Sequence, residues 1–286
     1  MASQDAQHRP VLVVSHERSG THLLIDTLRR NFPACRARPR LGANPHDVLY
    51  CSVDRLADDH PRPITVERAG RVLARAPRPL LKSHATPAFE GFAPGPRAWL
   101  EAALGSGVVL WIVRDGRAVM PAYHLHRRAV DPATPAGLSE FLRAPVAGVV
   151  PPARWARHAE AWRERSRVDP RVHAVRFEDL LADPRGELER LADALGEPAR
   201  PADPILPPRG ASPWNARLAR LTGRLRSTNL VERAPRPPKW REAFTRDDRA
   251  DFDRHAGDTL IRLGYEPDHA WVADPANRPA DGGAAP

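Results

Sequence analysis

The sequence contains little cysteine, little lysine and no long apolar segment. Only two cysteines, Cys35 and Cys51, occur in 286 residues. Two cysteines are too few for a disulfide framework, so we interpret them as reduced thiols of a cytoplasmic protein. The N-terminus lacks the basic start and apolar stretch of a signal peptide. The longest apolar segment, residues 107–113, has the length of a strand, so no membrane span is expected.

The basic residues are almost all arginines. Of 44 lysines and arginines, only Lys82 and Lys239 are lysines, and the formal net charge is +9. A positive charge of this size favours an anionic partner such as a nucleotide, a nucleic acid, an acidic substrate or a membrane surface. An arginine-rich coding bias would produce the same excess, so the charge alone does not choose among these partners.

Short apolar segments alternate with helical patterns along the chain. Segments of strand length without polar interruption indicate strands buried on both faces, as in parallel sheets. We therefore predict an α/β fold, a P-loop-like three-layer sandwich whose central parallel sheet is flanked by helices. The predicted strands are residues 11–15, 79–83, 108–113 and 172–177, and the predicted helices are residues 21–30, 116–128, 153–167, 184–195 and 246–263.

The predicted domain boundaries follow from composition. Residues 1–10 are expected to be a flexible N-terminus, residues 11–271 a single domain, and residues 272–286 a disordered tail rich in Ala, Pro, Asp and Gly. Residues 36–78 are rich in Arg and Pro and only weakly periodic, and residues 130–153 read as a proline-rich loop.

A small polar loop follows the first predicted strand. Residues 16–22 read HERSGTH. Small residues such as Ser19 and Gly20 let an anion approach the backbone, and the next helix offers free N–H groups and its positive dipole end. Arg18 adds a fixed positive charge. A capped tight turn is the structural alternative, and the Walker lysine is absent because Thr21 follows the glycine.

Charged side chains also mark the ends of two further strands. Lys82 and His84 lie two residues apart in LLKSHATP, so a cation and a base share one face of the strand end. Histidine is the side chain best suited to act as a general base near neutral pH. Arg114 ends strand 108–113 just before a helix, which is a second anion site of the same design. Taken singly, each residue also fits a solvated surface position.

A basic, proline-stiffened segment lies near the C-terminus. Residues 231–245 read VERAPRPPKWREAFT and end in Trp240 and Phe244. A solvated basic loop followed by two core aromatics is the simplest reading of this segment alone. Two anion-binding elements, a Lys/His pair and this basic loop in one α/β chain are more than chance usually delivers.

In this order the segments resemble those of the sulfotransferases that use 3′-phosphoadenosine 5′-phosphosulfate (PAPS). HERSGTHLL resembles their 5′-phosphosulfate loop, LLKSHATP the segment with their catalytic histidine, and IVRDGRAVMPAYH their 3′-phosphate strand and helix. The FEDL…DP signature from residue 177 onward and RAPRPPKWREAFT are similar to the remainder of their cofactor site. The resemblance spans roughly residues 11–265.

The resemblance implies a role for individual positions. It implies His84 as the general base, with Lys82 and Arg18 stabilising charge on the transferring group. Phe177 falls where the family places an aromatic against adenine. The cofactor-binding positions that the resemblance implies are Arg18, Ser19, Gly20, Thr21, His22, Leu23, Arg114, Phe177 and, in the final loop, Arg233 or Arg236.

Some positions depart from the family pattern. Ala122 stands where a helix serine usually helps to bind the 3′-phosphate, and Leu23 stands where many members have an adenine-stacking tryptophan. In the final loop, Ala234 and Pro235 follow Arg233 in place of Lys and Gly. These departures concern the 3′-phosphate and the adenine, not the Lys/His pair.

The implied reaction is in-line transfer of a sulfuryl group from PAPS to a hydroxyl or amine of a small-molecule acceptor, with release of the desulfated nucleotide (PAP). Such a transfer requires mainly positioning and charge stabilisation, so no metal is expected. His124 and His126 lie two apart on a predicted helix and therefore on different faces, which argues against a ligand pair.

Two other functions are compatible with parts of the sequence. A P-loop kinase or NTPase would explain the loop at 16–22 but should carry the Walker lysine. A non-catalytic polyanion or nucleic-acid binder would explain the charge, and residues 214–226 could form a basic amphipathic helix. We favour a packing role for that helix and expect no nucleic-acid partner. The sequence does not identify the acceptor, and it leaves open whether the protein forms a homodimer.

Overall fold

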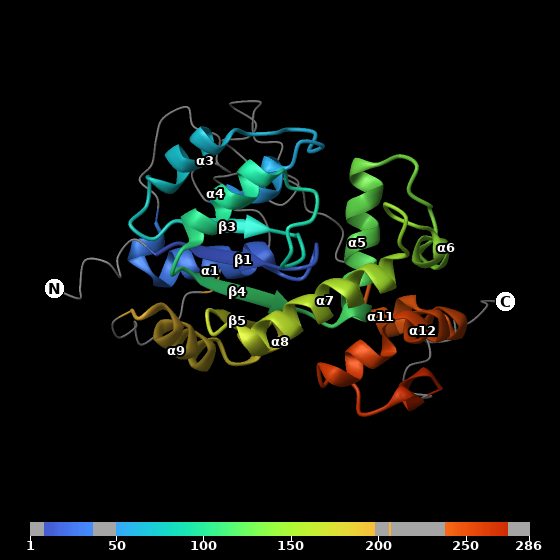
Figure 1. The fold of residues 1–286 in the computed structure, drawn as a ribbon. Helices are drawn as coiled ribbons and strands as arrows, with labels where there is room; N and C mark the ends of the chain where they lie inside the picture. Colours follow the sequence, from blue (N-terminus) through green and yellow to red (C-terminus); the bar gives the residue numbers. More distant parts are fainter. Residues whose placement is uncertain (1–8, 37–49, 198–205, 207–237, 274–286) are drawn as a thin grey trace, which may run out of the picture. The chain divides into compact units, whose positions relative to one another are not determined.

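The computed structural model describes residues 9–36, 50–197, 206 and 238–273 (Figure 1). The chain divides into two compact units. The first comprises Met1–Val113 with Ala161–Glu232, and the second comprises Arg114–Glu160 with Arg233–Pro286. The single domain 11–271 stays a prediction. The predicted amphipathic helix at 214–226 lies outside the described residues.

A five-stranded parallel sheet forms the centre of the first unit. Its strand order is β2-β3-β1-β4-β5, and every neighbouring pair is parallel. The carboxyl ends of parallel strands meet at one edge, which is where α/β folds bind ligands. The strands are β1 (Val11–Val14), β2 (Cys51–Ser52), β3 (Leu80–Ser83), β4 (Val108–Val113) and β5 (Val172–Arg176).

The strands form because their apolar residues can be buried on both faces. All four residues of β1 have no exposed surface, and β4 is buried along its whole length. Val11 and Val13 belong to a hydrophobic cluster that includes Leu24 and Leu28 of α1 and Leu191 of α9. Helices therefore cover this face of the sheet, as expected for strands without polar alternation.

Among the helices of the first unit, α9 begins and ends at residues that favour helix termini. In α9, the Asp183 side chain caps the amide of Gly186 at 3.0 Å, Pro184 is the first helical residue, and Gly196 ends the helix with φ 60°. The helices are α1 (Thr21–Asn31), α3 (Val66–Leu73), α4 (Pro94–Leu104), α8 (Phe177–Ala182) and α9 (Pro184–Leu195).

The second unit is helical. Its helix α12 starts with a capping box in which Thr245 and Asp248 bond reciprocally to each other's backbone N–H groups. Trp155 packs against Phe252 with ring centroids 5.9 Å apart. The elements of this unit are α5 (Gly116–Val130), α6 (Leu138–Arg143), α11 (Trp240–Ala243) and α12 (Arg246–Arg262), and α7 (Pro151–Val168) contributes residues to both units.

The predicted fold class is confirmed, because a parallel sheet flanked by helices is present and all four predicted strands occur in it. The structure adds β2 and α3 within the weakly periodic segment 36–78, and α6 within 130–153. β2 has two residues, which is too short to leave a periodic pattern. No helix in the described residues combines the length and the apolar composition needed to cross a membrane.

Candidate active site

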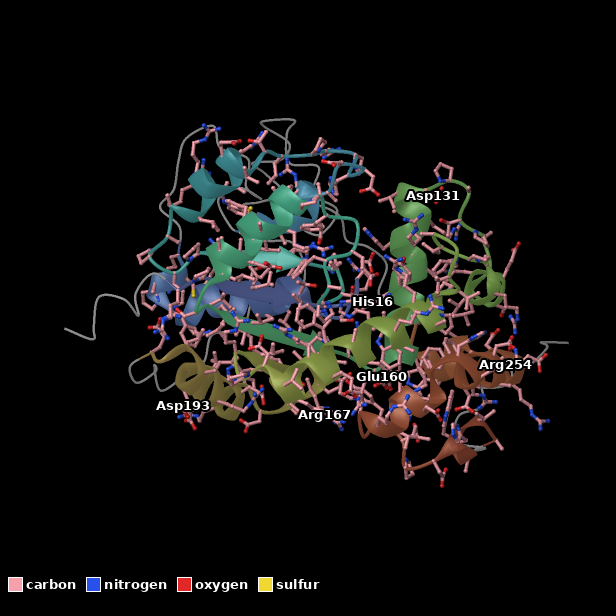
Figure 2. All side chains as sticks on the ribbon, in the orientation of Figure 1. His16, Asp131, Glu160, Arg167, Asp193 and Arg254 are labelled. Carbon is pink, nitrogen blue, oxygen red and sulfur yellow. The ribbon has the colours of Figure 1, made fainter. Side chains whose placement is uncertain are left out.

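The loop between β1 and α1 is closely packed and backbone-constrained. Arg18 adopts φ 67° and Gly20 adopts φ 105°, a region that side chains other than glycine rarely occupy. A Cβ atom on Gly20 would lie 2.5 Å from Cδ2 of Phe177. Glycine is therefore required here for both conformation and packing. His16, the second residue after β1, is labelled in Figure 2 and is buried.

Two hydroxyls inside the loop differ in their bonding. Ser15 Oγ and Thr21 Oγ1 lie 2.6 Å apart and form a buried hydrogen bond that closes the loop. Ser19 is 1 % exposed, and its hydroxyl has no hydrogen-bond partner within the described part of the chain. A buried hydroxyl without a partner is costly, so its presence at the start of α1 fits a site that binds an anion such as a phosphate.

Hydrogen bonding fixes the tautomer of His84. Its Nδ1 atom lies 2.8 Å from the carbonyl oxygen of Ser15, and a carbonyl can only accept. Nδ1 therefore carries the proton, and Nε2 keeps the lone pair that a general base needs. The ring is closely surrounded by protein, yet part of the residue remains accessible. This combination suits a base that must reach a bound acceptor.

The environment of His84 also sets its charge. Burial, and then the positive charge of Lys82, lower the pKa of His84 to about 4, against the opposing effects of Glu17, Asp54 and the bond to Ser15. The imidazole is therefore neutral at pH 7 and can accept a proton. Lys82 thus acts electrostatically on His84, in keeping with their spacing of two residues at the end of a strand.

Lys82 is a buried cation to which the described part of the chain offers no direct partner. It is 9 % exposed and lies opposite Val13 in the β1–β3 register. None of the described residues forms a hydrogen bond or an ion pair with its ammonium group. Burial lowers the pKa of Lys82, and the negative charges of Asp54 and Glu17 offset this only in part. Such a cation is poised to interact with a negatively charged ligand.

Asp54 belongs to the site although no sequence pattern predicts it. Its carboxylate accepts hydrogen bonds from the Ser83 hydroxyl at 2.5 Å and from the His84 backbone N–H at 3.0 and 3.1 Å. Asp54 lies in a 3₁₀ turn, Val53–Leu56, within the segment that shows little periodicity. No local signal marks it, because its partners are about 30 residues away in the sequence.

The remaining positions of the predicted loop site pack locally. His22 Nε2 lies 3.1 Å from the Tyr50 hydroxyl, and their rings meet edge to face. Leu23 is partly buried against the hydrophobic cluster. Phe177 starts α8, and its ring covers Gly20. The loop, Lys82, His84 and Phe177 thus belong to one unit.

The predicted 3′-phosphate positions fall in the second unit. Arg114 follows β4 directly, and Ala122 is buried in α5. Arg233 and Arg236 lie outside the described residues. The roles of Arg114, Arg233 and Arg236 therefore stay predictions.

The second arginine of the RDGR segment, Arg117, has a packing role. It is 2 % exposed and donates to Asp115 at 2.8 and 3.0 Å and to Glu266. Its guanidinium also lies 4.2 Å from the ring centroid of Trp240 and 4.7 Å from that of Trp271. These contacts join the start of α5 to α11 and to the end of the described chain.

Several aromatic side chains of the second unit belong to its core. Phe141 is fully buried and Trp155 is 1 % exposed, so neither forms a wall open to an acceptor. His124 Nε2 donates to the Pro135 carbonyl at 2.8 Å and its ring lies on Phe141. Within the described residues, no group of three or more His, Cys, Asp or Glu side chains could hold a metal ion.

Comparison with known proteins supports the resemblance seen in the sequence. Residues 106–207 match the family model of the sulfotransferase domain. No curated protein matches the chain.

Solved structures share the fold. Mouse sulfotransferase SULT7A1 complexed with PAP has a TM-score of 0.54 and 17 % identity, covering 96 % of this chain and 93 % of that one. The sulfotransferase domain from the curacin biosynthetic pathway has a TM-score of 0.51 and 16 % identity, covering 90 % and 98 %. The resemblance to sulfotransferases is therefore confirmed, by a sulfotransferase-domain match over residues 106–207 and by the sulfotransferase fold of the described structure.

Proposed function

We propose that this protein transfers a sulfuryl group from PAPS to a hydroxyl or amine of a small-molecule acceptor. The observation that carries the proposal is the bond from His84 Nδ1 to the Ser15 carbonyl, beside the buried cation Lys82. An oriented, neutral base and a cation without a partner among the described residues support the proposal. The buried Ser19 hydroxyl, which no described residue bonds, lies in the same unit and supports it further. We also propose the cytoplasm as the compartment, as the low cysteine content suggests.

In the proposed step, Nε2 of His84 takes the proton of the acceptor as the acceptor oxygen or nitrogen forms a bond to sulfur. The bond between sulfur and the bridging oxygen of the 5′-phosphate breaks, and PAP leaves with that oxygen's electron pair. General base catalysis of this kind contributes about 10²–10⁴ in rate. The loop around Ser19 and Gly20 would hold the 5′-phosphate, and Phe177 would lie against the adenine.

Lys82 and Arg18 would stabilise the negative charge that develops on the sulfuryl and bridging oxygens. Each preorganised donor of this kind contributes about 10²–10³ in rate. Arg18 keeps its charge at all relevant pH values and is a poor proton donor, so its role would be electrostatic. As the resemblance implies, Arg114 and one of Arg233 and Arg236 would contact the 3′-phosphate.

The low pKa of His84 is compatible with this role. A base with a pKa of about 4 is weak, because the imidazolium that forms is disfavoured by burial and by Lys82. Binding of the anionic donor would bring negative charge beside His84 and Lys82. That charge favours the protonated form of His84 and would raise its pKa towards the range useful for catalysis. The base would thus become effective when the donor is bound.

The test is to incubate the protein with labelled PAPS and a broad panel of acceptors and to identify the products by mass. With an acceptor in hand, His84→Ala is expected to lose about 10²–10⁴ in rate. The matched control is His255→Ala, which removes an exposed histidine on α12 and should keep the wild-type rate. Undiminished rates in His84→Ala would remove His84 as the base.

Thermal shift assays separate the proposal from its competitors. Stabilisation by PAP, without Mg²⁺, is expected for a PAPS-dependent sulfotransferase. A shift with ATP and Mg²⁺ but not with PAP would instead support a P-loop kinase or NTPase. A shift with DNA that disappears steeply with salt would support a polyanion binder.

A further inference from the structure

Asp54 lies just beyond the point where strand β2 stops pairing with β3. The edge strand β2 pairs with β3 only at Cys51 and Ser52, which face Leu81 and Lys82. Beyond that point, no residue of β2 can bond the backbone of His84 on this side. A buried backbone N–H without a partner is unfavourable, so the next element must provide an acceptor. The 3₁₀ turn Val53–Leu56 brings Asp54 to that position.

The Asp54 carboxylate organises three successive residues. It accepts from the Ser83 hydroxyl at 2.5 Å and from the His84 N–H at 3.0 and 3.1 Å. The Ser83 oxygen in turn accepts from the Ala85 N–H at 3.0 Å. Trp162 Nε1 donates to the Ala85 carbonyl at 3.0 Å on the same segment. The backbone that carries His84 is therefore held from both sides, and one carboxylate makes most of these bonds.

Asp54 also acts on the two charged groups of the site. Three titratable and charged groups face His84. They are Lys82 of β3, Glu17 of the loop between β1 and α1, and Asp54 of the 3₁₀ turn. Lys82 feels the same two carboxylates. Asp54 raises the pKa of both Lys82 and His84 against the effect of burial. It therefore helps Lys82 to stay charged although no described residue pairs with it directly.

We infer that Asp54 is a positioning residue for the transfer. Through Ser83 and the His84 backbone it fixes the end of β3, so that His84 Nε2 meets the acceptor and Lys82 meets the bound donor in a reactive geometry. This inference rests on the proposed function, because it assigns Asp54 to the same site. Asp54 itself touches neither the donor nor the acceptor in this scheme.

Kinetics of two Asp54 variants test the inference. Asp54→Ala removes both the hydrogen bonds and the charge, and we expect kcat to fall on the order of 10²-fold while the Kd for PAP changes little, since misplacing a catalytic group costs about this much. Asp54→Asn keeps an acceptor oxygen for Ser83 and His84 and should recover a large part of that loss. The control Asp58→Asn removes an exposed carboxylate four residues away and should match wild type.

A second measurement distinguishes positioning from general stabilisation. We expect ¹⁵N NMR of His84 to show the Nδ1-protonated form in wild type and a mixture of tautomers in Asp54→Ala. In Asp54→Asn the pKa of His84 should fall below its wild-type value, because a negative charge is lost while the hydrogen-bond geometry is retained. If Asp54→Ala fails to fold, Ser83→Ala removes one of the same hydrogen bonds and is measured in the same way.

The inference is overturned if Asp54→Ala keeps the wild-type kcat. It is also overturned if the fall in kcat is fully explained by a smaller folded fraction and the His84 tautomer is unchanged. Failure of the proposed function is a different result. In that case wild type would transfer no sulfate from PAPS to any acceptor, yet the NMR signals of His84 would still report whether Asp54 orients it.

Discussion

The two units each contain a buried cation, and the two cations have opposite surroundings. Arg117 in the second unit is enclosed by two carboxylates and two tryptophan rings. Lys82 in the first unit is almost as buried, yet no described residue forms an ion pair or a hydrogen bond with its ammonium group. Burial opposes the charge of both side chains, but only Arg117 has direct partners that compensate.

The pKa shifts of the two cations have opposite directions for this reason. Burial acts to lower the pKa of Arg117, but the hydrogen bonds and charges of Asp115 and Glu266 outweigh it, so its pKa is raised. Burial lowers the pKa of Lys82, and Asp54 and Glu17 compensate only in part. A fully paired buried cation holds structure together. A buried cation without a direct partner marks a site that can bind an anion.

The largest expected effect comes from removing the paired cation. Arg117→Met leaves Asp115 and Glu266 without their common partner, and we expect the free energy of unfolding to fall by about 3–5 kcal/mol, as for other broken buried pairs. Urea denaturation measures this loss. Arg241→Met is the matched control, because exposed Arg241 also stacks on Trp240 at 4.4 Å, and its loss should cost about 1 kcal/mol or less. Equal losses in the two variants would contradict the structural role of Arg117.

Replacing Lys82, which no described residue pairs with directly, should lower the activity without lowering the stability. In Lys82→Met the rate of sulfate transfer should fall by about 10²–10³ because a preorganised charge is lost. The free energy of unfolding should stay constant or rise, since a buried charge without a direct partner is replaced by an apolar side chain. Lys239→Met, at the other lysine of the chain, is the control for stability because its side chain is 84 % exposed. A clear loss of stability in Lys82→Met would place Lys82 in the same class as Arg117.

The pH dependence of His84 sharpens the comparison. NMR titration without nucleotide should give a pKa of about 4, and bound PAP should raise it because negative charge favours the imidazolium. In the unfolded chain histidine titrates near pH 6.5, so between pH 6.5 and about 4 the unfolded state binds more protons. The contribution of His84 to stability is therefore fully present above pH 6.5 and falls as the pH drops towards 4.

The variant His84→Gln checks the sign of that effect, because it should lose less stability than wild type as the pH falls through this window. A pKa near 6.5 for His84 in the protein without nucleotide would contradict the burial of His84 and the effect of the Lys82 charge on it.

A smaller effect on the binding of PAP is expected from removing the buried Ser19 hydroxyl in the loop between β1 and α1. Ser19→Ala removes a donor that has no partner among the described residues, so the free energy of unfolding should not fall. If Ser19 bonds the 5′-phosphate, the binding free energy of PAP should weaken by about 1.5–3 kcal/mol, measured by calorimetry. Ser166→Ala, whose hydroxyl donates to a carbonyl within α7, should leave the affinity for PAP unchanged. Unchanged affinity in Ser19→Ala would separate this hydroxyl from the phosphate.

The sequence by itself determined the elements that depend on local patterns. Apolar segments such as Val108–Val113 can be buried on both faces only as inner strands of a parallel sheet. Asp183, Pro184 and Gly196 mark the two ends of α9, because the unpaired backbone groups of a helix end select these residues. The two-residue period of a strand also predicts that Lys82 and His84 share a face at the end of β3.

Only the tertiary structure decided which distant residues complete the site. His84 bonds to a carbonyl 69 residues away and is held by a carboxylate 30 residues away, because the strand order places β3 between β1 and the short β2. The same RDGR segment that supplies Arg114 buries Arg117 between tryptophans, which its charge alone did not indicate. Periodicity encodes which face of an element is buried. It does not encode which elements become neighbours, because that depends on packing the whole chain at once.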